Sequence, residues 1–126
     1  MSTADTVVHI VDDEEVVRNS LAFLLSSAGF AVRVHESATA FLQLAANIRN
    51  GCLITDLRMP EESGMSLIKR LREHTSRQHL PVIVTSGHAD MEDVSDMLRL
   101  QVLDLFRKPI YHVRLLETLD NLFPKP

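Results

Sequence analysis

Hydrophobic positions along this chain fall into two patterns that alternate from one end to the other. Short apolar runs are typical of strands buried on both faces of a sheet, and longer stretches of helical period are typical of amphipathic helices. The apolar runs predict strands at residues 6–11, 30–35, 52–56, 82–86 and 103–107. The periodic stretches predict helices at residues 14–28, after Ser37, after Ser63, at residues 90–100 and at residues 112–123.

Several residues between these segments are suited to helix ends. Ser37 and Ser63 are expected N-caps, because a serine hydroxyl accepts a hydrogen bond from a backbone N–H of the first turn. Gly29 is expected to end the first helix, since glycine readily adopts the left-handed conformation that follows many helices. The helix residues expected to face the core are Val17, Leu21, Leu24, Leu25, Ala28, Phe41, Leu44, Ala45, Leu67, Ile68, Leu71, Leu116, Leu119 and Phe123.

Strands that alternate with helices predict a parallel sheet covered on both faces, because parallel neighbours need a crossover connection. We therefore expect an α/β fold with a doubly wound, five-stranded parallel sheet and right-handed crossovers. Such a sheet binds ligands at the carboxyl ends of its strands. Candidate functional residues are accordingly sought where the predicted strands end.

Composition narrows the class of protein. The length of 126 residues and the 45% hydrophobic content fit one domain, residues 1–126, with a flexible start at 1–5 and a domain end or linker at 124–126. The net charge of −4 and the lack of a Lys/Arg block argue against direct contact with nucleic acid. No signal-peptide pattern or membrane-length apolar run is present, so we expect a cytoplasmic location and no membrane contact. Cys52, the single cysteine, is expected to pack as a small apolar residue.

Charged residues follow three of the predicted strands. Asp12 and Asp13 follow the first strand, Asp56 ends the third, and Lys108 follows the fifth. Carboxylates gathered at one sheet edge repel one another unless they share protons or surround a cation. Mg²⁺ is the favoured cation for hard oxygen ligands, and Mn²⁺ would accept the same set. With Lys108 and the hydroxyl of Ser86 nearby, Asp56 is suited to attack a phosphoryl group and form an aspartyl phosphate.

At this point the residues match a known family. The matching segments are Val11-Asp12-Asp13-Glu14, Thr55-Asp56-Leu57-Arg58-Met59-Pro60, Gly64, Thr85-Ser86-Gly87-His88 and Lys108-Pro109. Over nearly its whole length the chain resembles the receiver domain of two-component response regulators, most like receivers of the FixJ/NarL group. The resemblance implies a CheY-like, flavodoxin-like fold with strand order 2-1-3-4-5.

The resemblance also implies a role for each acid. Asp56 would be the phosphoacceptor and would share the metal with its neighbours. Asp13 and the backbone carbonyl of Arg58 would bind Mg²⁺ directly, and Asp12 would act largely through water. The domain would then be a signalling phosphoacceptor rather than an enzyme, with at most self-catalysed phosphorylation and dephosphorylation. Its phosphodonor would be a histidine kinase or a phosphotransfer protein.

The same resemblance assigns the residues on the other side of the site. Ser86 would be the hydroxyl that moves toward the phosphoryl oxygen, and Lys108 would be the ionic partner of that oxygen. Thr85 is an alternative hydroxyl, but strand alternation points it to the opposite face, and the family match selects Ser86. Pro109 is implied to follow a cis peptide bond and to belong, with Ser86 and Leu105, to the signalling residues.

Two positions depart from the family pattern. Gln101 stands where a glycine usually ends the fourth helix, so either the turn is rebuilt or about 1 kcal/mol of strain is tolerated. Leu105 stands where receivers usually carry Phe or Tyr, the ring that moves with the hydroxyl. Two roles are open for Met97, Leu100 and Leu105. They either fill the core or add apolar area to the face formed by helix 4, strand 5 and helix 5. That face would pair as a homodimer or dock an effector.

Other interpretations of these residues remain open. A metal-dependent phosphohydrolase would also use an Asp nucleophile, but Arg58 stands two residues after Asp56 where such an enzyme ordinarily has an acid. A flavodoxin-like cofactor carrier and a receiver that signals through its dimer face without phosphate fit less of the pattern. Glu14 and Glu15 are expected to favour a helix N-terminus. The histidines, at 9, 35, 74, 79, 88 and 112, show no metal-ligand spacing and are expected to be surface or strand residues.

Overall fold

The chain folds around a five-stranded parallel sheet, as predicted. The computed structural model describes residues 6–45, 48, 50–74, 80–87 and 91–124. The strands are hydrogen-bonded in the order β2-β1-β3-β4-β5, so the order reverses between β1 and β3. Their bounds are β1 Thr6–Val11, β2 Ala31–His35, β3 Asn50–Asp56, β4 Val82–Ser86 and β5 Asp104–Arg107.

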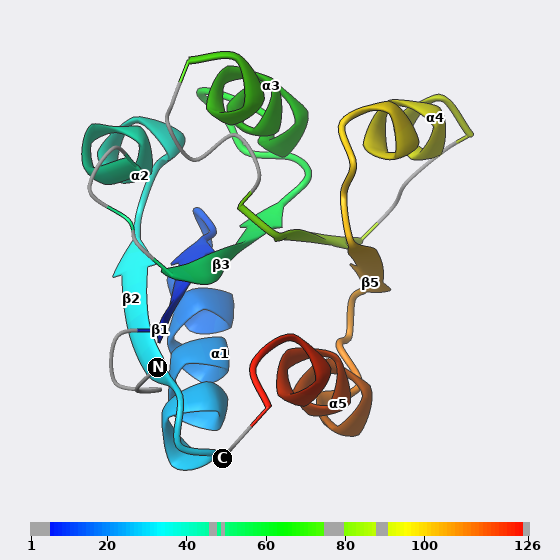
Figure 1. Ribbon diagram of the computed structural model, residues 1–126. Coiled ribbons are helices and arrows are strands. Elements are labelled where there is room, and N and C mark those ends of the chain that lie inside the picture. Colours follow the sequence, from blue (N-terminus) through cyan, green and yellow to red (C-terminus); the bar gives the residue numbers. More distant parts are fainter. Residues whose placement is uncertain (1–5, 46–47, 49, 75–79, 88–90, 125–126) are drawn as a thin grey trace.

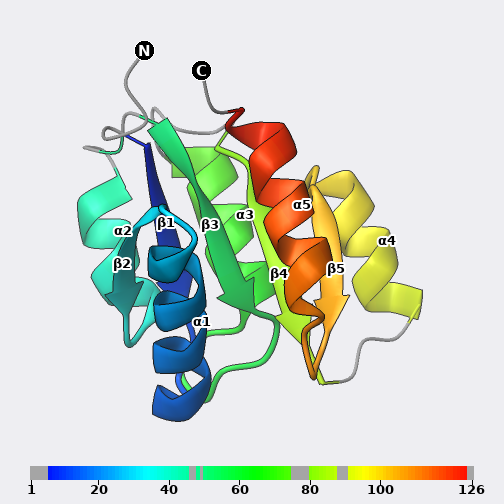
Figure 2. The same cartoon turned by 90° about the horizontal axis from the view of Figure 1, so that it is seen from below.

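A helix follows each strand, and the helices form two layers around the sheet. Figure 1 shows α2, α3 and α4 on one face and α1 and α5 on the other, and the turned view of Figure 2 shows α1 and α5 crossing in front of the sheet. Their bounds are α1 Glu15–Ser27, α2 Ala38–Ala45, α3 Gly64–His74, α4 Met91–Arg99 and α5 His112–Leu122. Where the start or end of a helix was predicted, it differs from the observed one by a single residue at most.

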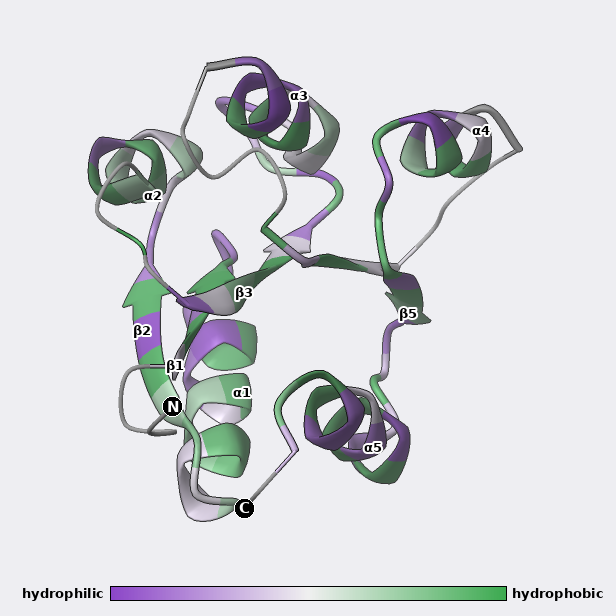
Figure 3. Ribbon diagram, in the orientation of Figure 1, coloured by the Kyte–Doolittle hydropathy of each residue, from purple (hydrophilic) through white to green (hydrophobic). Residues whose placement is uncertain are grey.

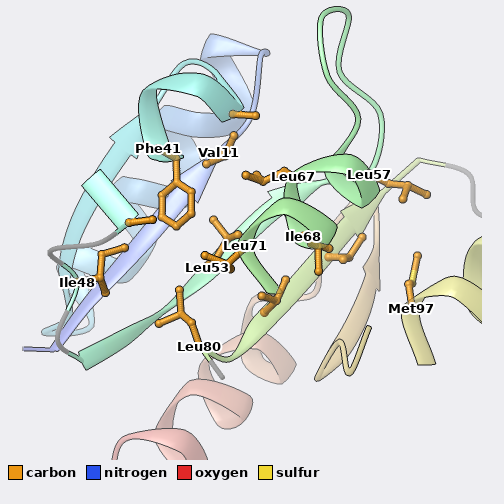
Figure 4. Close-up of a cluster of buried hydrophobic side chains, with 14 residues drawn as sticks. Val11, Phe41, Ile48, Leu53, Leu57, Leu67, Ile68, Leu71, Leu80 and Met97 are labelled. Carbon is orange, nitrogen blue, oxygen red and sulfur yellow. The ribbon is translucent and has the colours of Figure 1, made fainter. Parts of the chain in front are cut away.

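The sheet separates two hydrophobic clusters. In β3 and β4, Leu53 and Val84 belong to the cluster under α2, α3 and α4, whereas Ile54 and Ile83 belong to the cluster under α1 and α5. This alternation is what two-sided burial of a strand requires. Figure 3 shows hydrophobic residues along the sheet and on helix sides that face it, and Figure 4 shows the first cluster.

The predicted inward faces are largely confirmed, with a correction in α5. Leu115 is fully buried there, whereas the predicted Leu116 is half-buried. Leu44 in α2 is also only half-buried. Buried Cys52 packs as predicted, and burial raises the pKa of its thiol to about 12. Among the described helices, none combines the length and the apolar character needed to cross a membrane.

Both serine caps and the glycine end are confirmed. Ser37 Oγ accepts from the Ala40 N–H and Ser63 Oγ accepts from the Ser66 N–H, each at 3.1 Å. Gly29 follows α1 with a φ of 96°. Gln101 also adopts a left-handed φ, of 59°, and next to it the Val102 N–H donates to the Met97 carbonyl at 2.9 Å. The turn after α4 is therefore kept and its strain is tolerated.

The start of α3 passes very close to the end of β3. The Gly64 N–H donates to the Leu57 carbonyl at 2.8 Å. A Cβ placed on Gly64 would lie 2.2 Å from the Asp56 carbonyl oxygen. Because that neighbour is backbone, it has little room to shift. Glycine at this position thus allows α3 to pack directly under the loop that follows Asp56.

Two histidines meet inside the fold, which their spacing in the sequence did not predict. His9 Nδ1 and His35 Nε2 lie 3.0 Å apart, and both rings are almost fully buried. The two rings are stacked, and each meets the Phe41 ring edge-on. Burial lowers the pKa of His9 to about 4, with further lowering from His35 and Arg33. Burial and Arg33 also lower the pKa of His35.

We predict that Gly64→Ala lowers the free energy of unfolding by about 1–3 kcal/mol, because the added methyl group overpacks against the Asp56 backbone. Urea unfolding measures the change. Gly87→Ala is the matched control, since an added Cβ there would meet nothing within 4 Å. Equal unfolding midpoints for the two variants would contradict the close approach.

We predict that stability falls as the pH drops from about 6.5 toward about 4 because of the histidine pair. In this window the unfolded histidine binds a proton that the folded one does not, so acid favours unfolding. A loss on the order of 1–3 kcal/mol is expected, since one pKa unit is worth about 1.4 kcal/mol.

The measurement is urea unfolding across this pH range. The double variant His9→Leu/His35→Leu should show a shallower slope than the wild type, and His112→Gln, which removes an exposed ring, serves as the control. A slope unchanged in the double variant would refute the assignment to this pair.

Candidate functional site

Adjacent strands bring three carboxylates together at the carboxyl edge of the sheet. Asp12 and Asp13 directly follow β1, and Asp56 is the last residue of β3, the hydrogen-bonded neighbour of β1. One oxygen from each carboxylate lies within 4.8 Å of the others. Asp12 and Asp56 are buried, whereas Asp13 is exposed. The edge therefore presents a set of oxygen ligands with one side open to solvent.

Lys108 enters this group from the loop after β5. Its Nζ lies 3.1 Å from Asp56 Oδ2 and 3.4 Å from Asp12 Oδ2. It also lies 3.4 Å from Glu14 Oε1. Glu14, expected to favour only the start of α1, thus also belongs to the charged cluster, and nothing in the sequence signalled this contact. Lys108 is the counter-charge that links the ends of β1, β3 and β5.

Burial and charge act in opposite directions on these groups. Burial raises the pKa of Asp12, and the nearby Asp56 charge raises it further, while the Glu14 N–H and Lys108 lower it; the net shift is upward. Burial lowers the pKa of Lys108, but the hydrogen bond to Asp56 and the charges of Asp12, Asp56 and Glu14 outweigh it, and the net shift is upward. The lysine is held as a cation, yet one lysine leaves negative charge in excess.

Backbone groups hold the two buried carboxylates in place. The Glu14 N–H donates to Asp12 Oδ1 at 2.9 Å, and the Arg18 guanidinium donates to the Asp12 carbonyl at 2.8 Å. The Arg58 N–H donates to Asp56 Oδ1 over a longer 3.4 Å. The Arg58 carbonyl, the remaining predicted metal ligand, belongs to the same loop, and its role as a ligand stays a prediction.

Both hydroxyl candidates lie at the end of β4. Ser86 is buried, and its carbonyl accepts from the Lys108 N–H at 2.8 Å. Thr85 is also buried, and the strand register sets its Cα beside that of Asp56. Because Ile83 and Val84 belong to opposite clusters, alternation along β4 directs these two hydroxyls to opposite faces. The choice of Ser86 stays a prediction.

The three apolar residues considered for the helix 4, strand 5 and helix 5 face lie on the side of the sheet toward α4. Met97 is buried, and Leu100 and Leu105 are half-buried against the same cluster, so these three mainly fill the core. Among the side chains described around α4 and the start of β5, Val94, Leu98 and Leu103 are exposed and apolar. The Lys108–Pro109 peptide bond is cis, as the resemblance implied. His88, part of the segment that matches the family, lies outside the described residues.

The donor set fits a hard divalent cation. The ligand atoms are carboxylate oxygens, and two of the carboxylates are buried while the third faces solvent. Mg²⁺ prefers a few carboxylates and retains several waters, which an open, acidic sheet edge permits. A hollow of about 440 Å³ open to solvent lies beside Asp13 and the loop after β3. The site can therefore hold a cation next to the Asp56 carboxylate.

Comparison with known proteins gives matches over nearly the whole chain. The family model described as response regulator receiver domain matches residues 8–120. The transcriptional regulatory protein FixJ of Rhizobium meliloti (strain 1021) is 44% identical over 117 residues, which cover 93% of this chain and 56% of that protein. The chain thus spans about half the length of the curated relatives it matches.

Solved structures agree with this match. The crystal structure of FixJ-N has a TM-score of 0.84 at 43% identity and covers 97% of this chain and 94% of its own. Full-length FixJ from B. japonicum has a TM-score of 0.82 at 32% identity, covering 93% of this chain and 57% of its own. Family model, relatives and fold coincide with the acidic sheet edge, and the chain accordingly belongs to the response regulator receiver domain family, with FixJ-type regulators among its relatives.

Proposed function

We propose that Asp56 is the phosphoacceptor of this receiver and that its phosphorylation requires a divalent cation. The observation that supports this most is the convergence of three carboxylates within 4.8 Å of one another, with Lys108 Nζ 3.1 Å from Asp56. Few functions other than binding a cation and a phosphoryl group would use such a costly cluster of charges.

The transfer itself needs little beyond positioning and charge. An Asp56 oxygen attacks the phosphorus of the donor, a P–O bond forms, and the bond from phosphorus to the donor nitrogen or oxygen breaks, with the electron pair leaving on the donor. Asp12 is held by the Glu14 N–H at its carboxylate and by the Arg18 guanidinium at its carbonyl, and Asp56 is buried, so little reorganisation is required. A phosphohistidine donor that carries a proton on its other ring nitrogen leaves as a neutral imidazole.

The metal would be Mg²⁺, or Mn²⁺ in its place. Asp13, Asp56 and the Arg58 carbonyl would bind it, with Asp12 acting through water. When bound, it neutralises charge on the phosphoryl oxygens and on the attacking carboxylate. The exposed Asp13 can reorient to reach a cation, whereas the buried Asp12 is fixed by the Glu14 N–H.

Lys108 and Ser86 would recognise the phosphoryl group on its other side. Lys108 can exchange its contact with Asp56 for a phosphoryl oxygen, because its Nζ already lies at hydrogen-bond distance from the acceptor. The Ser86 hydroxyl would donate to another phosphoryl oxygen. Once Lys108 and Ser86 face the phosphoryl group, the ends of β4 and β5 respond to phosphorylation.

The partners follow from this role. A histidine kinase or a phosphotransfer protein in the cytoplasm would supply the phosphoryl group. The α4, β5 and α5 face, which exposes Val94, Leu98 and Leu103, would pair with a second copy or dock an effector. Relatives named as transcriptional regulators point to transcription as the controlled output.

We predict that acetyl phosphate adds one phosphoryl group to the wild type with Mg²⁺ and none after chelation, because the acceptor's negative charge must be neutralised for in-line attack. Intact mass spectrometry measures the adduct, and hydroxylamine should remove it. Asp56→Asn should stay unmodified, and Asp120→Asn, an exposed change on α5, should react like the wild type. A hydroxylamine-labile phosphate on Asp56→Asn would refute the assignment.

We predict that Lys108→Ala slows this phosphorylation at least about tenfold, whereas Lys69→Ala, an exposed change on α3, leaves it within about twofold. A charge-assisted hydrogen bond in a partly buried site contributes about 1.5–3 kcal/mol, far more than a surface charge. The initial rate of adduct formation at fixed Mg²⁺ is the measurement. Equal rates for the two variants would place Lys108 outside the reacting site.

A further inference from the structure

The loop after Asp56 is joined to α4 by an ion pair. Arg58, two residues after the acceptor, places its guanidinium 2.9 Å from Asp93 Oδ2, a residue 35 positions away in the first turn of α4. The Asp93 side chain is 17% exposed and that of Arg58 61%. The backbone N–H of the same arginine donates to Asp56 Oδ1. Arg58 thus contacts both the acceptor carboxylate and α4, which belongs to the face formed by α4, β5 and α5.

The opposite end of α4 is fixed differently. Met97 is buried in the cluster under α2, α3 and α4, as Figure 4 shows. The Arg72 side chain, on α3, donates to the Leu100 carbonyl at 3.0 Å and to the Leu80 carbonyl at 2.6 Å. The left-handed Gln101 then turns the chain into β5. These contacts anchor the carboxyl end of α4 to the core, while the ion pair attaches its first turn to the acceptor loop.

Leu105 makes the Arg58–Asp93 contact more important for coupling, because the leucine side chain offers no polar contact of its own. Leu105 lies in register with Val84, on the face of the sheet toward α4. Leucine has no polar group, so it has no hydrogen bond to gain or lose when the Ser86 hydroxyl moves. A ligand shifts a conformational equilibrium only through contacts that differ between the two states. The Arg58–Asp93 pair joins the loop of the site to the helix, which is where a contact of this kind has to lie.

We propose that the Arg58–Asp93 ion pair couples the acceptor site to α4, with Arg58 as a positioning residue. The inference rests on the proposed function of Asp56 and deepens it by naming a regulatory contact. The pair is formed in the arrangement in which Lys108 Nζ contacts Asp56 Oδ2. It therefore stabilises that arrangement, and α4 pivots at its first turn when Lys108 and the loop turn to a phosphoryl group. Coupling of this kind is reciprocal. Loss of the Arg58–Asp93 pair therefore favours binding of a phosphoryl group at the loop after β3.

The test is a double-mutant cycle on binding of beryllofluoride, a phosphoryl mimic, in the presence of Mg²⁺. Calorimetric titration would compare the wild type, Arg58→Ala, Asp93→Ala and the double variant. We expect each single variant to bind about twofold to fivefold more tightly, which is the range of a partly exposed ion pair, and the double variant to bind no more tightly than either.

The signs of the two single changes separate coupling from a simple electrostatic field. A field alone would change the beryllofluoride affinities of Arg58→Ala and Asp93→Ala in opposite directions, since one variant removes a positive charge and the other a negative charge. Coupling through the pair makes both bind more tightly. Asp93→Glu, which keeps the pair, should restore wild-type affinity.

Asp96→Ala is the matched control. Asp96 is another acid of α4, but it pairs with Arg99 of the same helix rather than with the acceptor loop. Its effect should be additive with that of Arg58→Ala. A wild type that fails to bind beryllofluoride with Mg²⁺ would overturn the proposed function and this inference together. Binding by the wild type with additive or opposite effects at positions 58 and 93 would overturn the inference alone.

Discussion

The structure depends on the balance of charge at the carboxyl edge of the sheet. Asp12 and Asp56 are buried there within reach of Asp13, and their repulsion is offset by Lys108, whose ammonium contacts both buried carboxylates. Burying like charges together is unfavourable unless a cation is present. Lys108 supplies part of that charge, and the remaining negative charge suits the edge to the divalent cation and phosphoryl group proposed above.

The fold serves this charge cluster by fixing the ends of its strands. Parallel pairing of β1 with β3 brings their carboxyl ends to one edge, and two apolar clusters bury both faces of the sheet. Gly64 lets α3 approach the backbone of Asp56, which sets the path of the loop carrying Arg58. That loop leads to α4 through Asp93, so a change at the acceptor has a direct structural route to the face formed by α4, β5 and α5.

Local signals in the sequence predicted the alternating strands and helices and the acids, whereas the strand order followed from the resemblance to receiver domains. Asp12, Asp56 and Lys108 each come at or just after an apolar run, and parallel strands bring such ends together. Contacts that depend on helix phase or side-chain reach were not predicted. Leu115 rather than Leu116 is fully buried since helix rotation is weakly specified by sequence, and His9 meets His35 only once β1 pairs with β2. Glu14 with Lys108 and Arg58 with Asp93 likewise join residues that the chain alone keeps far apart.

The most direct test of the charge balance is to locate a divalent cation by nuclear magnetic resonance. Paramagnetic Mn²⁺, added in substoichiometric amounts to the isotopically labelled protein, broadens amide signals close to where it binds. The account predicts that signals of Asp12, Asp13, Asp56 and Arg58 are lost first, that excess Mg²⁺ restores them, and that Asp13→Asn weakens the effect. Broadening spread evenly over the acidic surface, or concentrated away from the carboxyl edge of β1 and β3, would contradict it.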